Sequence, residues 1–333
     1  MGQYLEQPLS WTNGLIFAGA AVALLGIVLF FVMYAIFFQR KILGWMQLRI
    51  GPNRVGPWGL FQTVADVFKL LLKEDIIPKK ADKALFIIAP VLAFVPSFLV
   101  LAVMPFTENW HFADIGGGLL FYLAISSLTV IGVITGGWAS NNKYGLIGAM
   151  RGAAQMISYE IPLVLSVVGI ILMTGSLNLI DIVEKQQSMG VWFAFAQLPA
   201  FIIFIIAQLA ELGRSPFDLL EAESELISGY HVEYSGFRFA FFMLTEYVYI
   251  FAMASLTTVL FLGGWSPMFG LDFIPGIIWF ALKMGAIVFF IFWLHATMPR
   301  IRIDQLMKLG WKVLIPLALL NIFITAIVKT AFM

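Results

Sequence analysis

The sequence contains no cysteine and little charge. Of its 333 residues, 12% are Asp, Glu, Lys or Arg, and 61% are hydrophobic. The absence of cysteine excludes disulfides, thiolate zinc sites and iron–sulfur clusters held by this chain's own thiolates. A soluble domain is roughly one-quarter charged. A chain with about half that share is therefore predicted to lie within a membrane.

Histidine is also scarce, with three residues at His111, His231 and His295. Only His295 falls within an expected membrane span, whereas a bis-histidine haem inside the bilayer needs two histidines at that depth. We therefore expect no redox centre in this chain. The net charge of +1 gives no electrostatic basis for binding nucleic acid. The first thirteen residues lack the Lys or Arg of a cleavable signal peptide, so we expect the N-terminus to be retained.

Long apolar runs fill most of the chain. A helix that crosses the hydrocarbon core needs about 20 apolar residues, and lipid offers the backbone no hydrogen-bond partners, so each span must be helical. The sequence predicts an all-α polytopic membrane protein with eight transmembrane helices plus an amphipathic inner-side helix. We expect one integral-membrane domain over residues 1–333, with long inner-side connectors at about 39–83 and 212–238. The expected spans are 14–38, 84–104, 119–139, 157–175, 194–211, 239–262, 276–298 and 313–331.

Lys and Arg are unevenly distributed between the connectors. Seventeen of the 20 lie in the connectors after spans one, three, five and seven, whereas Lys185 and Lys329 lie on the opposite side. Cytoplasmic connectors are enriched in Lys and Arg. We therefore expect these four connectors to face the cytoplasm, or its organellar equivalent, and both termini to lie on the outer side.

The first long connector contains an amphipathic segment. Residues 58–74 place a narrow polar stripe on an otherwise apolar helix, and the stripe consists of Gln62, Asp66, Lys69 and Lys73. Such a helix either lies at the membrane interface or lines a cavity with its polar stripe while its apolar sides pack on protein. The preceding segment GPNRVGP, 51–57, has two glycines and two prolines and predicts a rigid turn.

The connector between spans five and six concentrates acid. Residues 211–234 hold six of the nineteen carboxylates. The segment FDLLEAESELI, 217–227, predicts a helix on which Glu221 and Glu225 share a face; like charges at that spacing repel, and in a cavity they would share a proton. The alternative is an ordinary solvated loop, which the many apolar residues disfavour. Plausible partners for the acids are Arg214, Arg238 and His231.

Four ionisable residues fall within or beside expected spans: Glu246, Glu160, Lys283 and His295. Such groups are costly in lipid and usually face the bundle interior or a water path. For Glu160 and His295, close to the inner interface, capping or snorkelling is an equal alternative. Glu246 lies deeper, and a carboxylate has no long stem on which to snorkel, so a functional role is favoured.

Four long segments carry a resemblance that extends over nearly the whole chain. They are LGWMQLRIGPNRVGPWGLFQTVADVFKLLLKEDIIP, GWASNNKYGLIGAMRGAAQMISYE, RSPFDLLEAESELISGYHVEYSGFRFAFFMLTEY and MPRIRIDQLMKLGWKVLIPL. The chain resembles the quinone-chamber membrane subunit of proton-pumping NADH:quinone oxidoreductase, respiratory complex I. In that family the subunit joins the hydrophilic arm to the membrane arm, and electrons reach quinone from an iron–sulfur cluster in partner subunits.

The resemblance implies roles for individual residues. It implies that a proton path runs through Glu211, Glu221, Glu223, Glu225, Glu233, Glu246 and Glu160. It implies that residues of the quinone chamber or the arm interface are Asp66, Arg40, Arg49, Arg54, Lys69, Gln39 and His295.

The resemblance also implies the chemistry and the partners. It implies quinone (ubiquinone or menaquinone) as substrate, no covalently bound cofactor or metal in this chain, and FMN and iron–sulfur clusters in partner subunits only. The implied partners are iron–sulfur and quinone-module subunits on the inner side, small and antiporter-like subunits in the membrane, and lipid, with no nucleic acid. The implied location is an energy-transducing membrane, the bacterial plasma membrane in the first place.

The chain departs from the family pattern at three places. The family usually has Glu where this chain has Gln39, Arg where it has His295, and Pro where it has Leu220. Loss of a carboxylate and a cation together predicts that Gln39 and His295 face each other as a neutral pair.

Other functions remain open at this point. A homologous subunit of a membrane-bound hydrogenase or another dehydrogenase shares the general pattern. An ion transporter would use Glu246, Lys283 and His295, but the sequence shows no internal repeat of the inverted-transporter kind. A structural anchor for the hydrophilic arm would account for the basic connectors but not for Glu246 or the acid cluster.

Overall fold

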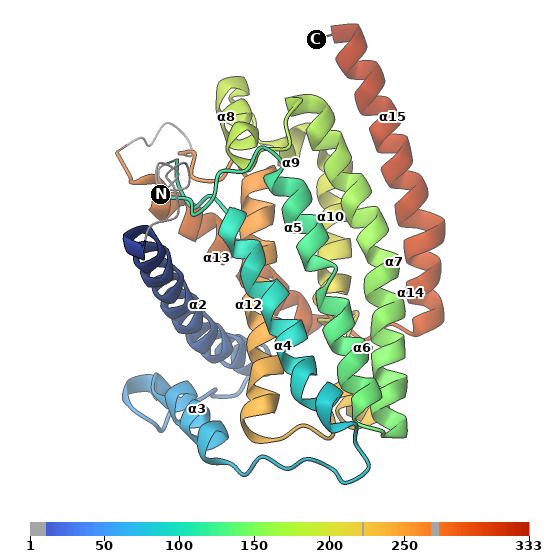
Figure 1. Ribbon diagram of the computed structural model, residues 1–333. Helices are drawn as coiled ribbons and strands as arrows, with labels where there is room; N and C mark the ends of the chain where they lie inside the picture. Colours follow the sequence, from blue (N-terminus) through green and yellow to red (C-terminus); the bar gives the residue numbers. More distant parts are fainter. Residues whose placement is uncertain (1–10, 109, 222, 268–272, 333) are drawn as a thin grey trace.

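The computed structural model describes residues 11–108, 110–221, 223–267 and 273–332, and all regular structure within those ranges is helical (Figure 1). The main bundle is built from α2 (Trp11–Met46), α4 (Lys83–Leu99), α5 (Gly118–Ser126), α6 (Thr129–Ala139), α7 (Lys143–Thr174), α10 (Leu198–Glu211), α12 (Gly236–Phe261), α13 (Gly276–Thr297) and α15 (Ile315–Phe332). Shorter elements are η1 (Pro57–Gly59), α3 (Gln62–Leu72), η2 (Val100–Val103), α8 (Leu179–Met189), α9 (Phe193–Ala196), α11 (Glu223–Leu226), η3 (Gly229–His231), α14 (Ile303–Leu309) and η4 (Gly310–Leu314).

Seven helical segments of the described chain are long and apolar enough to cross a membrane. They are Asn13–Met46, Lys83–Val103, Gly118–Ala139, Lys143–Thr174, Gly236–Phe261, Gly276–Thr297 and Ile303–Ala331. The expected span 194–211 is divided between α9 and the 14-residue apolar helix α10. The all-α polytopic membrane fold predicted from the sequence is confirmed.

Two expectations for the segments between spans are wrong. Residues 140–156 do not form a connector, because α7 begins at Lys143 and runs unbroken for 32 residues. The predicted helix over 217–227 is reduced to the four residues of α11. Gln155 Nε2 donates to the carbonyl oxygens of Ala210 (2.5 Å) and Phe217 (2.7 Å), so the first residue of this segment is bonded to α7. Tertiary contacts thus outweigh the local helix propensity.

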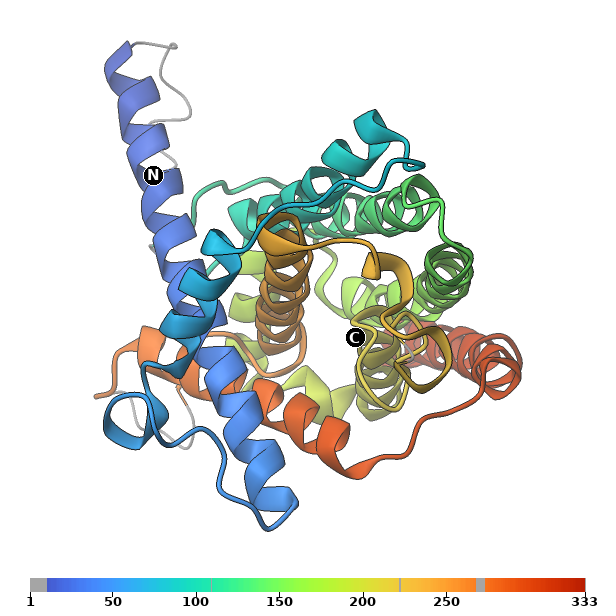
Figure 2. The same cartoon turned by 90° about the horizontal axis from the view of Figure 1, so that it is seen from below.

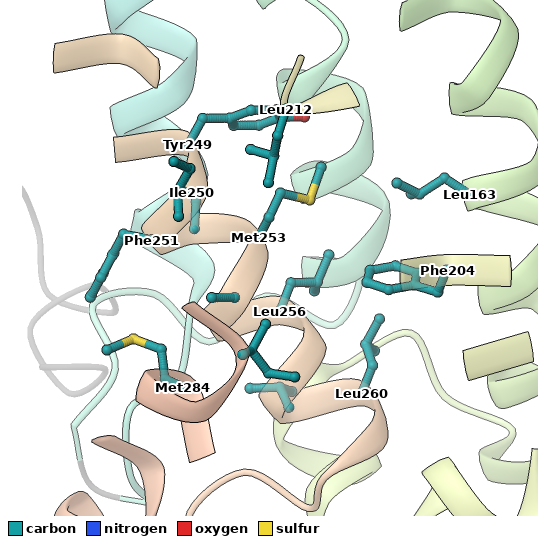
Figure 3. Close-up of a cluster of buried hydrophobic side chains, with 14 of the residues drawn as sticks. Leu163, Phe204, Leu212, Tyr249, Ile250, Phe251, Met253, Leu256, Leu260 and Met284 are labelled. Carbon is teal, nitrogen blue, oxygen red and sulfur yellow. The ribbon is translucent and has the colours of Figure 1, made fainter. Parts of the chain in front are cut away.

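Helix α12 passes through the middle of the bundle (Figure 2). Nearly every side chain from Tyr247 to Phe261 is buried. Figure 3 shows Met253, Leu256 and Leu260 of α12 packed toward Phe204 of α10 and Leu163 of α7. Because α12 is surrounded by protein, any polar group on it must find its partners inside the bundle.

The break between α9 and α10 falls at Gln197, whose backbone is non-helical (φ −124°, ψ 49°). The side chain of Gln197 is buried and forms hydrogen bonds with α15: its Nε2 donates to Thr325 Oγ1 (2.9 Å) and its Oε1 accepts from Asn321 Nδ2 (2.9 Å). Asn321 and Thr325 are four residues apart and so lie on one face of α15. The interrupted helix is therefore tied to the last helix by polar contacts.

The long connectors 47–82 and 212–235 lie at the same end of the bundle, and the start of α2 and the end of α15 lie at the other (Figure 1). Near the second end, the buried Lys283 Nζ donates to the carbonyl oxygens of Gly264 (3.0 Å) and Ser266 (2.7 Å). This cation ties α13 to the chain after α12 and lies apart from the acidic residues described below.

Helix α3 has an unusual orientation for an amphipathic helix. Asp66, Lys69 and Lys73 of its polar stripe line a pocket, whereas Phe68 and Leu72 are 59% and 85% exposed. Three of the four stripe residues thus line a cavity, as in the second alternative, but the apolar sides of α3 do not pack on protein as that alternative expected. The apolar side of α3 is left for lipid or for a partner.

Candidate functional site

A buried ion pair lies where the acidic connector meets α12. Arg214 Nη2 is 2.9 Å from Glu246 Oε1, and the two side chains are 8% and 19% exposed. The Arg214 guanidinium also stands 4.9 Å from the centre of the Tyr247 ring. Tyr247 in turn donates its hydroxyl to Gln39 Oε1 of α2 at 2.6 Å. A chain of polar contacts therefore joins α2, α12 and the acidic connector.

Glu211 forms a second buried acidic centre at the end of α10. Its side chain is 4% exposed, and Oε1 accepts a hydrogen bond from the Tyr249 hydroxyl. Oε2 has no hydrogen-bond partner within the described part of the chain. Glu160 of α7 lies close enough to Glu211 for the two carboxylates to repel each other. Glu211 and Glu246 thus have their polar partners inside the bundle, whereas the role of the partly buried Glu160 stays a prediction.

The remaining acids of the connector lie nearer the surface and have separate partners. Glu225 pairs with Arg151 of α7 at 2.6 Å, and Glu233 Oε1 accepts from Asn142 Nδ2 at 2.6 Å. The α11 helix begins at Glu223, whose side chain lies outside the described part of the structure. Because Glu221 precedes α11 in a turn, Glu221 and Glu225 do not share a helical face, and that prediction is wrong.

His231 faces Glu221 from η3 across 3.9 Å, measured from Nδ1 to Oε1. The imidazole is 6% exposed and contacts the edges of Tyr230 and Phe239. Burial in this aromatic setting lowers the pKa of His231 to about 4. The ring is therefore neutral at physiological pH, and it does not neutralise Glu221.

Arg40 and Asp66 form a further ion pair, 2.5 Å apart, between α2 and α3. Together with Lys69 they line a pocket of about 330 Å³ at the connector end of the bundle. The exposed Arg49 instead donates to Gln47 at 2.7 Å, and Arg54 is exposed in the turn before η1. Of the cations expected at the quinone chamber, Arg40 and Lys69 are thus brought together with Asp66, while Arg49 and Arg54 are not.

His295 lies within the electrostatic range of Arg214 and Asp218. Asp218 itself pairs with Arg300 at 2.9 Å, and this pair joins the acidic connector to the chain after α13. Gln39 is bonded to Tyr247. A direct contact between Gln39 and His295 stays a prediction.

Sequence reasoning missed three residues that organise the site: Tyr247, Tyr249 and Gln155. All three are buried and form hydrogen bonds between helices far apart in the sequence. The signal for the tyrosines was present in the segment TEYVY, 245–249, where two hydroxyl groups follow Glu246 within one turn. Gln155 gives no such signal, since its partners are backbone carbonyl groups.

The arrangement suits proton transfer and charge coupling. One buried carboxylate (Glu211), two partly buried ones (Glu246 and Glu160), one buried guanidinium and two tyrosine hydroxyls lie in an apolar bundle, where electrostatic interactions are stronger than in water. A change of charge at the connector end alters the free energy of ionising each carboxylate. These features define a polytopic all-α membrane protein with an internal charged network.

Comparison with known proteins assigns this membrane protein to a family. The profile of the NADH dehydrogenase family matches residues 19–326. The H subunit of the NADH-quinone oxidoreductase of Geobacillus sp. (strain WCH70) is 66% identical over 333 residues, which is 100% of this chain and 99% of the relative. The H subunit from Bacillus cytotoxicus is 66% identical and covers 98% of each chain, and that from Bacillus thuringiensis subsp. konkukian is 65% identical with the same coverage. The chain belongs to the NADH dehydrogenase family and is an integral protein of a bacterial membrane.

The Arg214–Glu246 pair generates a prediction about stability. Arg214→Gln should lower the stability by about 3–5 kcal/mol, because it leaves the buried Glu246 charge without its partner. Replacing both partners, Arg214→Met with Glu246→Leu, should cost much less. Arg151→Gln is the control, since its pair with Glu225 is partly exposed and is worth about 0–1 kcal/mol. Thermal unfolding of the purified complex measures all of these variants; equal losses for Arg214→Gln and Arg151→Gln would contradict a buried ion pair.

The lowered pKa of His231 generates a prediction about pH. An unfolded histidine has a pKa of about 6.5, so between about pH 4 and 6.5 the unfolded chain binds more protons than the folded one. The neutral His231 thus makes its full contribution to stability above about pH 6.5. This contribution, about 3 kcal/mol in all, is lost as the pH falls toward 4. His231→Gln should flatten the pH dependence of the unfolding temperature over this window, whereas His111→Gln, on the opposite side, should leave it unchanged. If both variants changed the pH dependence of the unfolding temperature equally, His231 would not be the group with the lowered pKa.

Proposed function

We propose that this chain is the quinone-chamber membrane subunit of a bacterial proton-pumping NADH:quinone oxidoreductase. The observation that carries the proposal is the 66% identity over the full length to a protein named as the H subunit of NADH-quinone oxidoreductase. The buried network of Arg214, Glu246, Tyr247 and Gln39 supports it, because that network joins the connector end of the bundle to α12.

In this proposal the redox groups are held elsewhere in the complex. A chain without cysteine supplies no thiolates for iron–sulfur clusters, so FMN and those clusters belong to partner subunits on the inner side. Quinone is the substrate and is reduced near the connectors 47–82 and 212–235. Small and antiporter-like membrane subunits continue the proton path. The connector end faces the cytoplasm, in line with its many Lys and Arg residues, and both termini lie outside.

The proposed coupling is electrostatic. Quinone reduction creates negative charge or takes up two protons, and either event changes the field at nearby carboxylates. At an effective dielectric constant of about 20, a unit charge 4 Å away is worth about 4 kcal/mol, which corresponds to a change of about three in the pKa of a carboxyl group. The acids of the connector respond first, and the Arg214–Glu246 pair and Glu211 carry the response into the bundle.

Purification from the native membrane tests the identity of the complex. The chain should copurify with iron–sulfur and flavin subunits, and the preparation should reduce quinone from NADH in a manner sensitive to quinone-site inhibitors. A chain that is stable alone and moves ions in vesicles without those subunits would reject the proposal in favour of a transporter.

The double variant Glu221→Gln with Glu225→Gln tests the proton path. Assembly should persist, because both carboxylates are partly exposed and the ion pair of Glu225 with Arg151 is worth about 0–1 kcal/mol. Coupled quinone reduction should fall about tenfold or more, since a positioned proton-transfer group contributes roughly 10²–10⁴-fold and the other acids retain part of the path.

The matched control removes two exposed carboxylates from the opposite end of the bundle, Glu108→Gln with Glu184→Gln. That variant should turn over and pump like the parent. Unimpaired turnover and pumping in the Glu221 and Glu225 variant would show that these acids are outside the path.

A further inference from the structure

Two buried polar atoms near the end of α10 have no hydrogen-bond partner within the described part of the chain: Glu211 Oε2 and the Tyr122 hydroxyl. The side chain of Glu211 is 4% exposed, and Tyr122 of α5 is fully buried. Tyr122 lies within the electrostatic range of Glu211, but no direct hydrogen bond joins the two side chains. Because buried polar groups in proteins are nearly always paired, these two atoms indicate a bound group between them.

The two carboxylate oxygens of Glu211 have different surroundings. Oε1 accepts a hydrogen bond from the Tyr249 hydroxyl, which extends from α12 toward the end of α10 (Figure 3). The Tyr249 hydroxyl also contacts Ser126, which lies four residues after Tyr122 and so on the same face of α5. Tyr249 is thus held between α10 and α5 at Oε1, and Oε2 is the oxygen of Glu211 that is left for a further partner.

The helix that carries Tyr122 is interrupted beside this centre. Within the apolar segment Gly118–Ala139, α5 ends at Ser126 and α6 begins at Thr129. Thr129 Oγ1 donates to the carbonyl oxygen of Ser126 at 2.8 Å. Irregular backbone at membrane depth is tolerated where it is buried in protein or lines a hydrated cavity. An apolar group beside the interruption would leave Glu211 Oε2 and the Tyr122 hydroxyl unpaired, whereas one water molecule can pair both.

We propose that one water molecule bridges the Tyr122 hydroxyl and Glu211 Oε2, and that Glu211 exchanges its proton with this water. The Tyr122 hydroxyl donates to the water oxygen, which leaves both hydrogens of the water free to be donated, one of them to Oε2. Tyr122 keeps its own proton and is therefore a positioning residue. The inference rests on the proposed function in one respect, because Glu211 exchanges protons only as a member of the proton path.

The exchange conserves the water. An O–H bond of the water breaks as the Oε2–H bond of Glu211 forms. Glu160, which lies close enough to Glu211 for the two carboxylates to repel each other, returns a proton to the water. The net change is one proton moved from Glu160 to Glu211. Because two like charges at short range disfavour ionisation of both groups, the two carboxyl groups favour a single shared proton.

A cryo-EM map of the purified complex, at a resolution that shows ordered water, tests the water site itself. The parent should show density for a water between the Tyr122 hydroxyl and Glu211 Oε2. Tyr122→Phe should lose this density, because it removes the hydroxyl and keeps the ring. Tyr249→Phe should retain it, because Tyr249 bonds to the other carboxylate oxygen. A parent map with no density between the two groups, or with Tyr122 bonded directly to Oε2, would overturn the proposal without the need for any variant.

The solvent isotope effect on quinone reduction by NADH tests the proton exchange. Tyr122→Phe should lower kcat about tenfold, since a positioned proton-transfer group contributes roughly 10²–10⁴-fold and the carboxylate itself remains. The solvent isotope effect should rise because proton transfer becomes slower, and the KM for quinone should not change. Tyr159→Phe is the matched control: Tyr159 is also fully buried, but its hydroxyl donates to the carbonyl oxygen of Leu306 at 2.9 Å. This variant should keep the kcat and the isotope effect of the parent.

An unchanged kcat and isotope effect in Tyr122→Phe would overturn the exchange, since a water seen in the map would then be purely structural. Equal losses of kcat in Tyr122→Phe and Tyr159→Phe would overturn it too, because the loss would then follow from removal of any buried hydroxyl. A parent complex that does not reduce quinone from NADH would instead reject the proposed function, and the map would still decide whether the water site exists.

Discussion

The burial of the Arg214 charge is the constraint on which the site depends. A guanidinium that is 8% exposed inside an apolar bundle is tolerable only with a counterion and further polarisable contacts. Glu246 supplies the counterion, and the face of Tyr247 supplies the further contact. Because these two residues are neighbours on the central helix, the position of Arg214 fixes how the acidic connector meets α12.

The same constraint places α2 in the network. Tyr247 stands under the guanidinium and donates its hydroxyl proton to a hydrogen bond with Gln39. A carboxylate at position 39 would add a second negative charge to the Arg214–Glu246 pair. A neutral amide accepts the hydrogen bond of Tyr247 without changing the net charge of this group. The neutral side chain of Gln39 is thus compatible with one cation and one anion at this point.

The fold could be predicted from the sequence to the extent that it depends on apolar length. Every long span was found in that way, because lipid admits helices only and the chain has few charges to interrupt them. The segments that were misplaced make contacts outside their own stretch of sequence: Gln155 of α7 bonds the carbonyl oxygen of Phe217, and α7 continues through a stretch rich in glycine and polar residues. The acids of the site could be found from the sequence because carboxylates are scarce in the rest of the chain. Their partners lie on other helices, and the periodicity of one segment does not predict which residues of another helix it contacts.

The polar attachment of the last helix sets its depth. Asn321 and Thr325 both bond to Gln197, and one helical turn advances the chain by about 5.4 Å. Sliding α15 by a single turn along its neighbour would therefore break both bonds and leave a buried amide unpaired, at a cost that apolar side chains alone would not impose. The polar side chain at the break between α9 and α10 therefore fixes the position of α15 along its own axis, and with it the depth of the last helix in the membrane.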